Sequence, residues 1–113
     1  MAEQIQASHL LVKHVHSSRP ASRLSDRITR SKEEAINKLL ELRSQIVSGQ
    51  AKLKDLAMQH SDCSSGARGG DLGQFRRGMM VKPFEDVAFA LNVGELSDVV
   101  DTPNGVHLIL RTA

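Results

Sequence analysis

The only cysteine of this 113-residue chain, Cys63, lies in a polar, glycine-rich segment that spans residues 61–73. A single free cysteine in a protein is most often a small buried hydrophobic residue. Cys63 instead has serine, aspartate and glycine neighbours, with Arg68 close by in the sequence, and such surroundings are typical of a reactive thiol. The sequence therefore indicates a thiol with a chemical role, whose partners must come from other parts of the chain.

Two histidines, His9 and His107, lie in segments whose residue patterns are typical of β-strands, at residues 4–13 and 106–111. Each has apolar residues two positions away, so each ring is expected to point toward the protein interior. Either histidine alone is more simply explained as a hydrogen-bonded core residue. Two such strands lying side by side would bring both rings together, and this arrangement favours a functional pair.

The residues His9, His107 and Cys63 do not form a recognisable metal site. Zinc sites normally use four ligands, often in closely spaced pairs, and the chain has neither a CxxC nor an HxxxH pair. His14 and His16 are two positions apart, but they lie in a basic segment whose positive charge opposes a cation. We expect no metal.

Cys63 together with either histidine would suit a thiolate–imidazolium pair for nucleophilic catalysis. The sequence supplies no recognisable oxyanion hole and no third residue to orient the histidine. The pair formed by Gly69 and Gly70 lacks the spacing of phosphate-binding glycine loops. We interpret this pair as a tight turn that needs positive φ angles.

Positive charge is concentrated in one part of the chain. The formal net charge is +2, but residues 13–32 alone carry +5 and the remainder therefore carries −3. The basic residues of this stretch, opposed only by Asp26, are Lys13, Arg19, Arg23, Arg27, Arg30 and Lys32. This pattern predicts a local anion-binding loop at about residues 13–30, with an ordinary solvated charged loop as the alternative. The cluster lies in a loop instead of a recognition helix, so we expect no nucleic-acid partner.

The apolar pattern outlines the elements that must position these residues. Residues 4–13 form a predicted strand with apolar residues on both faces, which indicates burial on both sides. Ser31 and Glu34 form a capping box at the start of a helix that ends at Gly49. The residues at helical spacing along it are Ile36, Leu39, Leu40, Arg43, Ile46 and Val47.

The second half of the chain predicts shorter elements. A helix is expected over residues 51–60, a strand over 72–75, and a third helix from residue 82 to about 92–94. Strands over residues 97–101 and 106–111 form a hairpin around residues 102–105 (Thr-Pro-Asn-Gly), because Asn-Gly is a strong turn signal. This order of elements predicts an α+β fold in which a small sheet is covered by helices.

The composition excludes several classes of protein. With 40% hydrophobic and 25% charged residues, the chain has the make-up of one globular domain over residues 1–113. No apolar run approaches the about 20 residues that cross a bilayer, and the N-terminus lacks a secretory signal pattern, so no membrane association is expected. One cysteine rules out an internal disulfide framework and suits a reducing compartment. We expect a monomer located in the cytoplasm, the nucleus or both.

Five segments, in this order, resemble the parvulin peptidyl-prolyl isomerases. They are ASHLLVKH at 7–14, SDCSS at 61–65, RGGDLG at 68–73, KPFE at 82–85 and GVHLILR at 105–111. The resemblance runs from about residue 5 to the C-terminus and is strongest to the eukaryotic branch that prefers phosphoserine- or phosphothreonine-proline bonds. It implies the parvulin form of the FKBP-like superfold, a four-stranded antiparallel sheet surrounded by about four helices.

The resemblance also implies roles for individual residues. His9 and His107 would be the paired histidines at the floor of the active site, Cys63 the thiol beside the substrate amide, and Thr102 the hydroxyl that hydrogen-bonds a histidine. The proline ring would be held by Leu72, Met80 and Phe84. The substrate phosphate would be held by Lys13 and Arg19. The implied partners are proteins with phosphorylated Ser/Thr-Pro sequences, and the implied mechanism is non-covalent and free of cofactors.

The chain departs from the phospho-directed pattern at several positions. Relatives usually carry two adjacent arginines in the basic segment, where this chain has Ser18 and Arg19, so Arg23 or His16 would have to replace the missing phosphate ligand. The tryptophan that many relatives have in this loop is absent. Val81 and Asn104 stand where relatives have glutamine and serine. Since the chain has no tryptophan or tyrosine, we expect a form without the upstream WW domain.

Three alternatives to a phospho-directed isomerase remain at this point. One is a general folding isomerase without phosphate preference, which the serine at position 18 favours. Another is a non-catalytic module that binds phosphopeptides, which the presence of the pocket and histidine residues disfavours. The third is an enzyme with Cys63 as nucleophile.

Overall fold

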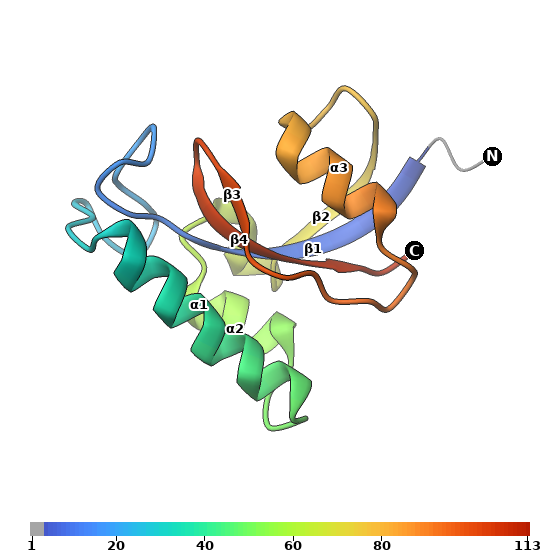
Figure 1. Ribbon diagram of the computed structural model, residues 1–113, viewed down its shortest axis with the longest axis horizontal. Helices are drawn as coiled ribbons and strands as arrows, with labels where there is room; N and C mark the ends of the chain where they lie inside the picture. The colour runs from blue at the N-terminus through green and yellow to red at the C-terminus, as the bar shows by residue number, and fades with distance from the viewer. Residues whose placement is uncertain (1–3) are drawn as a thin grey trace.

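The computed structural model describes residues 4–113, which form an α+β fold (Figure 1). Its elements in chain order are β1 (Gln4–Val12), α1 (Lys32–Val47), α2 (Leu53–His60), the 3₁₀ helix η1 (Ser64–Arg68), β2 (Asp71–Arg76), α3 (Lys82–Ala90), β3 (Val100–Thr102) and β4 (Gly105–Arg111). The strands form one antiparallel sheet in the order β2-β1-β4-β3. The predicted fold class is therefore confirmed, and three α-helices with one 3₁₀ helix are the helices of the described residues.

The helices cover both faces of the sheet. Figure 1 shows α1 and α2 on one side of the sheet and α3 on the other. The central strand β1 is buried on both faces, as predicted from its apolar pattern. Leu10 and Val12 pack with the helices α1 and α2, whereas Ile5 and Ala7 pack with α3 and Phe75. The alternation of β1 places His9 on the same side as Ile5 and Ala7, toward α3.

Helix α1 begins at the predicted capping box. The Ser31 hydroxyl accepts a hydrogen bond from the Glu34 backbone N–H, and the Glu34 carboxylate accepts one from the Ser31 N–H. The buried residues of this helix are Ala35, Leu39 and Leu42. Leu40 and Val47, which also occur at helical spacing, are 48% and 66% exposed. They lie one residue, or about 100°, outside the stripe at positions 35, 39, 42 and 46 that faces the sheet.

The last hairpin is shorter on its first side than predicted. Strand β3 begins at Val100, and residues 97–99 are not part of a strand. The cause is Ser97, whose backbone N–H donates to the Ile109 carbonyl while its hydroxyl accepts from the Ile109 N–H. The Ser97 hydroxyl thus accepts the hydrogen bond that a backbone carbonyl of a neighbouring strand would otherwise accept. Pro103 and Asn104 form the two-residue connection between β3 and β4.

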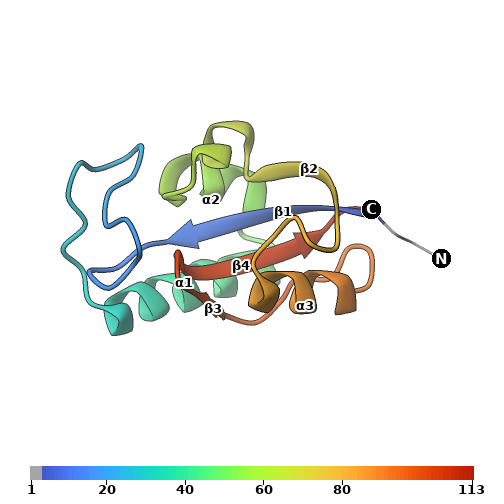
Figure 2. The same ribbon diagram turned by 90° about the horizontal axis from the view of Figure 1, so that it is seen from above.

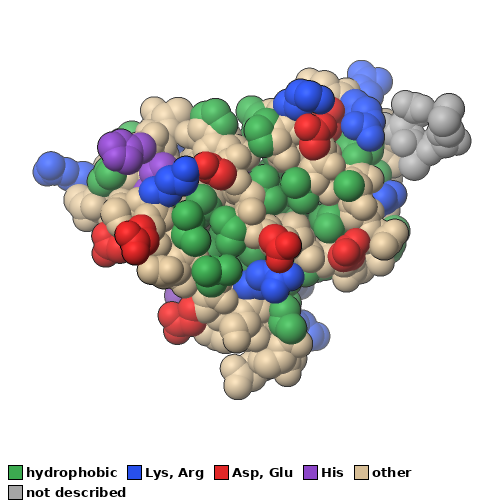
Figure 3. All heavy atoms as spheres, viewed as in Figure 1, with side chains coloured by type: hydrophobic (Ala, Val, Ile, Leu, Met, Phe, Trp, Pro, Cys, Tyr) green, Lys and Arg blue, Asp and Glu red, His purple; other side chains and the backbone are tan. Residues whose placement is uncertain are grey.

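The connection that follows α3 crosses the face of the molecule drawn in Figure 3. Apolar side chains gather there between α3 and α1. Within this connection, Leu96 and Val99 are partly buried against the core formed by α1, α2 and the sheet. None of the helices within residues 4–113 is both long and apolar enough to cross a membrane.

Residues 13–30, called the basic loop below, form an irregular excursion at one end of the sheet, between β1 and α1 (Figure 2). The loop is folded on itself. The Val15 N–H donates to the Arg30 carbonyl, and the N–H of the buried Ile28 donates to the Pro20 carbonyl. Helix α1 starts directly after it, so the loop is held at both ends by regular structure.

Candidate active site

Strands β1 and β4 are neighbours in the sheet, and this brings His9 and His107 together. Their register pairs Leu11 with His107 and His9 with Ile109. The two Nδ1 atoms are 3.0 Å apart, and the rings are nearly parallel, with centroids separated by 5.2 Å and an interplanar angle of 21°. Both side chains are buried. The pair expected from neighbouring strands is therefore present in the structure.

The two rings are held on three sides. Phe84, from α3, packs its ring edge-on against both histidines, with centroid distances of 5.5 Å to His9 and 5.3 Å to His107. The Thr102 hydroxyl lies 2.7 Å from His107 Nε2, and the Ser65 hydroxyl lies 3.2 Å from His9 Nε2. A continuous chain of hydrogen-bonding groups thus connects β3 with η1 through both rings.

The protonation of His107 limits how these hydrogen bonds can run. Burial and the nearby His9 together lower the pKa of His107 to about 3. His9 contributes because two adjacent imidazolium rings repel each other. At neutral pH the ring is therefore neutral, with one N–H. The Thr102 hydroxyl lies 2.7 Å from His107 Nε2 and 3.5 Å from the Gly105 carbonyl, and it accepts a hydrogen bond from the Asn104 N–H at 3.2 Å. His107 therefore donates through one ring nitrogen and accepts through the other, with Thr102 and His9 as its two partners.

The other ring nitrogen of His9, Nε2, lies 3.2 Å from the Ser65 hydroxyl, on the side of the ring that faces Cys63. Cys63 is half-buried and immediately precedes η1. Burial raises the pKa of its thiol, but hydrogen bonds from His9 and Ser65 and the electrostatic interaction with His9 together prevail and lower the pKa to about 6. Cys63 is therefore mainly a thiolate at neutral pH. These surroundings agree with the reactive thiol expected from the sequence.

The arginine beside Cys63 is not the one that the sequence places there. Arg68 contacts the Asp71 carbonyl at 3.5 Å. It is Arg23, from the basic loop, whose Nε donates to the carbonyls of Ser61 and Cys63 at 3.1 and 3.2 Å. The contact joins segments that are far apart in the sequence, so composition around the cysteine could not reveal it.

The turn formed by Gly69 and Gly70 fixes the backbone of His9. Both residues have positive φ angles, 70° and 82°, as the tight-turn interpretation requires. The His9 N–H donates to the Gly70 carbonyl at 2.9 Å, and a Cβ atom at position 70 would lie 2.1 Å from the His9 carbonyl oxygen. Only glycine allows this approach.

An apolar cavity of about 280 Å³ opens above the histidine pair. The residues expected to hold the proline ring, Leu72, Met80 and Phe84, line this one cavity. Met79 and Val81 form its exposed rim. Sequence analysis missed Met79, because nothing in the local pattern separates it from its neighbour Met80.

A second cavity of about 670 Å³ adjoins the first and is basic. Lys13 and Arg19 line it, as does Arg23. Lys13 Nζ donates to the carbonyls of Arg19 and Ala21 at 3.1 and 2.7 Å, so its ammonium group is anchored within the loop. The two cavities share the wall residues His9, Cys63, Asn104 and His107.

Arg23 serves mainly as a structural link, although it lines the basic cavity. Besides its contacts to Ser61 and Cys63, its Nη2 donates to the carbonyls of Ala57 and Met58. These carbonyls lie in the last turn of α2, where the helix leaves acceptors unpaired and favours positive charge. His16, the other suggested replacement, does not line the basic cavity and packs against His14.

Among residues 4–113 no three His, Cys, Asp or Glu side chains converge in a way that would suit a metal ion. The polar residues missed by the sequence analysis are Ser65, which contacts His9, and Asp62, a buried carboxylate next to Cys63. Both lie within the SDCSS segment, which was the only signal that pointed to them.

The sheet order, the histidine pair and the adjoining apolar cavity define a rotamase of the parvulin type. A family model described as "Rotamase: PPIC-type PPIASE domain" matches residues 9–113. The chain belongs to this family and is a peptidyl-prolyl cis-trans isomerase.

Members of this family are similar in sequence over nearly the whole chain. A peptidyl-prolyl cis-trans isomerase pin1 from Rhizopus delemar is 58% identical over 111 residues, which cover 98% of this chain and 74% of the relative. Pin1 from Arabidopsis thaliana is 50% identical over 115 residues, covering 98% of this chain and 97% of the relative. The structure of peptidyl-prolyl isomerase ESS1 from Candida albicans has a TM-score of 0.97 at 47% identity, covering 98% of this chain and 63% of that chain. The resemblance to the eukaryotic branch is confirmed.

Proposed function

We propose that this isomerase acts on Ser-Pro and Thr-Pro bonds and prefers those with a phosphorylated residue before the proline. The observation that carries the proposal is the joining of an apolar cavity to a basic one through His9, Cys63, Asn104 and His107. In a phosphoserine-proline sequence the ring and the phosphate are adjacent, so one substrate would fill both cavities. Several relatives carry the name Pin1, which supports the same substrate class.

The reaction is rotation about one amide bond, whose barrier of about 18–20 kcal/mol comes from resonance. As the amide twists, its oxygen loses negative charge and its nitrogen loses positive charge. An apolar environment opposes charge separation, so it favours the twisted state over the planar one. Leu72, Met80 and Phe84 would provide this environment around the proline ring. No covalent bond has to break, and no cofactor is needed.

The thiolate of Cys63 would assist electrostatically. It lies in the wall common to both cavities, where the amide before the proline would pass. A negative sulfur near the carbonyl oxygen repels the planar amide more than the twisted one, because the planar amide has the more negative oxygen. His9 would hold the thiolate by a hydrogen bond, and His107 and Thr102 would keep His9 in the required tautomer.

The phosphate would be bound by Lys13 and Arg19. A phosphorylated side chain brings a charge of about −1.5 to −2 and three acceptor oxygens at neutral pH. Both cations line the basic cavity, and charge-assisted hydrogen bonds to them would select the phosphorylated substrate. Ser18, at the position where relatives have an arginine, donates to Asn104 at 3.2 Å and ties the loop to the β3–β4 connection.

Isomerisation kinetics on three matched peptides test the proposal. The peptides contain Ser-Pro, phosphoserine-Pro or Glu-Pro in the same sequence. We expect the highest kcat/KM for phosphoserine-Pro, an intermediate value for Glu-Pro and the lowest for Ser-Pro. Equal values for all three would remove the phosphate preference and support the second candidate, a general folding isomerase, which Ser18 favours. Failure to accelerate any of the three would contradict the assigned substrate class.

A further inference from the structure

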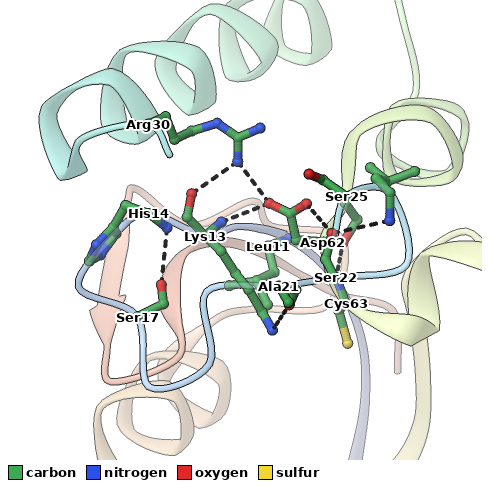
Figure 4. Close-up of polar contacts among 12 residues, drawn as sticks. Leu11, Lys13, His14, Ser17, Ala21, Ser22, Ser25, Arg30, Asp62 and Cys63 are labelled. Carbon is green, nitrogen blue, oxygen red and sulfur yellow. Dashed lines mark hydrogen bonds and ion pairs between the residues drawn. The ribbon is translucent and has the colours of Figure 1, made fainter. Parts of the chain in front are cut away.

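Asp62 is a buried carboxylate for which the proposed mechanism has no role. Its side chain is 1% exposed, and it lies next to Cys63 in the connection between α2 and η1. A buried charge is unfavourable unless it is paired and hydrogen-bonded. The side-chain partners of Asp62 all belong to the basic loop (Figure 4).

The carboxylate contacts the loop at its start, its middle and its end. Oδ2 accepts hydrogen bonds from the Lys13 backbone N–H at 2.8 Å and from Arg30 Nη1 at 3.0 Å. Oδ1 accepts one from the Ser22 hydroxyl at 2.7 Å. Arg30 Nη1 also donates to the Lys13 carbonyl at 2.9 Å, which closes the neck of the loop. One side chain therefore joins residues of the loop that are 17 positions apart.

Asp62 itself is held firmly by the central strand. Its backbone N–H donates to the Leu11 carbonyl at 2.7 Å. The Leu11 N–H in turn donates to the Ser61 hydroxyl at 3.0 Å. Figure 4 shows the Asp62 carboxylate directed toward the loop and the Cys63 side chain directed away from it. The same short segment thus presents one side chain to the loop and the next one to the catalytic cavities.

We propose that Asp62 is a positioning residue for the phosphate-binding site. It holds the basic loop in the conformation in which Lys13 and Arg19 line the cavity shared with Cys63. This role rests on the phosphate preference proposed above. A loop that is ordered before the substrate arrives does not lose its conformational freedom on binding, so the affinity for phosphate is higher.

Direct electrostatics and positioning give opposite expectations for Asp62. The carboxylate is negative and lines the basic cavity, so its charge alone would repel a phosphate. Its pairing with Arg30 reduces this repulsion. Removal of Asp62 would raise phosphate affinity if charge dominated, and would lower it if positioning dominated. The three hydrogen bonds from the loop favour the second outcome.

The test compares kcat and KM for phosphoserine-Pro and Ser-Pro peptides in Asp62→Ala and in the unchanged enzyme. We expect the ratio of the two kcat/KM values to fall about tenfold, the effect of losing about one hydrogen bond to a charged group, and to fall mainly through KM of the phosphopeptide. The control is Asp55→Asn, which also removes one negative charge. Asp55 is exposed in α2, and this change should leave the ratio unchanged.

Two further variants decide the matter should Asp62→Ala fail to fold. Ser22→Ala and Arg30→Gln each cut one contact from the side of the loop, and each should lower the same ratio. In an Arg19→Ala background these changes should have a smaller effect, because one phosphate ligand that the loop positions is already missing. A merely structural role would give the same loss in both backgrounds.

The outcomes separate this inference from the proposed function. One outcome would overturn the role of Asp62 alone: the wild-type enzyme prefers phosphoserine, and the ratio of the two kcat/KM values stays the same or rises in every folded variant. If the wild-type enzyme shows no preference for phosphoserine, both the role of Asp62 and the proposed phosphate preference are overturned.

Discussion

His9 and His107 share a buried contact of 3.0 Å between their Nδ1 atoms, and among residues 4–113 neither ring has a carboxylate within hydrogen-bonding distance. This differs from a nucleophilic triad, in which an acidic residue stabilises the charged histidine. The partners here are the hydroxyls of Thr102 and Ser65, and His107 is neutral at pH 7. The arrangement suits a fixed hydrogen-bond network more than repeated proton transfer.

The neutral state of His107 predicts an acid-dependent loss of stability. Its pKa is about 3 in the folded protein, compared with an ordinary value of 6.5. Between these values the unfolded chain binds more protons than the folded one, so the free energy of unfolding falls as the pH decreases from about 6.5 toward 3. Urea titrations across this range should show a shallower fall for His107→Asn. Equal slopes for the variant and the unchanged protein would contradict the neutral buried ring.

Cys63 should react as a thiolate well below the pH at which a free cysteine does. The rate of alkylation by iodoacetamide is expected to have its midpoint near pH 6, and unfolding in urea should move it to the ordinary range of about 8.5. Ser65→Ala should raise the midpoint, because it removes one hydrogen bond to the sulfur. A midpoint that urea does not change would show that the folded surroundings have no such effect.

Replacement of Cys63 separates electrostatic from covalent catalysis. Cys63→Asp keeps a negative group in the same wall, so we expect a loss of kcat/KM of up to about 100-fold, as for one electrostatic group. An enzyme that loses its nucleophile falls by about 10⁶-fold. The measurement is the isomerisation rate of the phosphoserine-Pro peptide, and loss of all detectable acceleration in folded Cys63→Asp would favour the covalent alternative.

Gly70 and Gly73 form a matched pair for testing the turn beneath His9. Both have positive φ angles, 82° and 70°, so alanine is strained by about 1–2 kcal/mol at either position. Only at position 70 would the new Cβ meet the His9 carbonyl, at 2.1 Å, whereas, apart from its chain neighbours, no atom of residues 4–113 lies within 4 Å of a Cβ at position 73. Gly70→Ala should therefore lose about 1–3 kcal/mol more in urea unfolding, and should also lower kcat. Equal effects of the two changes would contradict the close approach.

The sequence predicts much of the fold because most of its signals are local. Alternation in residues 4–13, the Ser31 capping box and the turn at residues 102–105 each depend on neighbours in the chain, and the structure confirms all three. The extent of β3 was wrong because it depends on Ser97, whose hydroxyl takes a place in the sheet that no local pattern reveals.

The site was predictable to the extent that it follows from strands and from the family motifs. His9 and His107 meet because their strands pair, and the residues expected around the proline line one cavity. The conformation of the basic loop depends on contacts across tens of residues, such as those of Asp62 with Ser22 and Arg30. Composition identifies the charge of such a loop but not the carboxylate that orders it.

The most direct test of the proposed function is the ratio of kcat/KM for phosphoserine-Pro to kcat/KM for Ser-Pro in Arg19→Ala, with Arg27→Ala as control. Arg19 lines the basic cavity, whereas Arg27 is exposed and does not, so the two variants lose the same charge from different places. We predict that Arg19→Ala lowers the ratio about tenfold, the effect of one charged hydrogen bond, while Arg27→Ala leaves it unchanged. Equal ratios in both variants and in the unchanged enzyme would contradict the proposal that this cavity binds the phosphate.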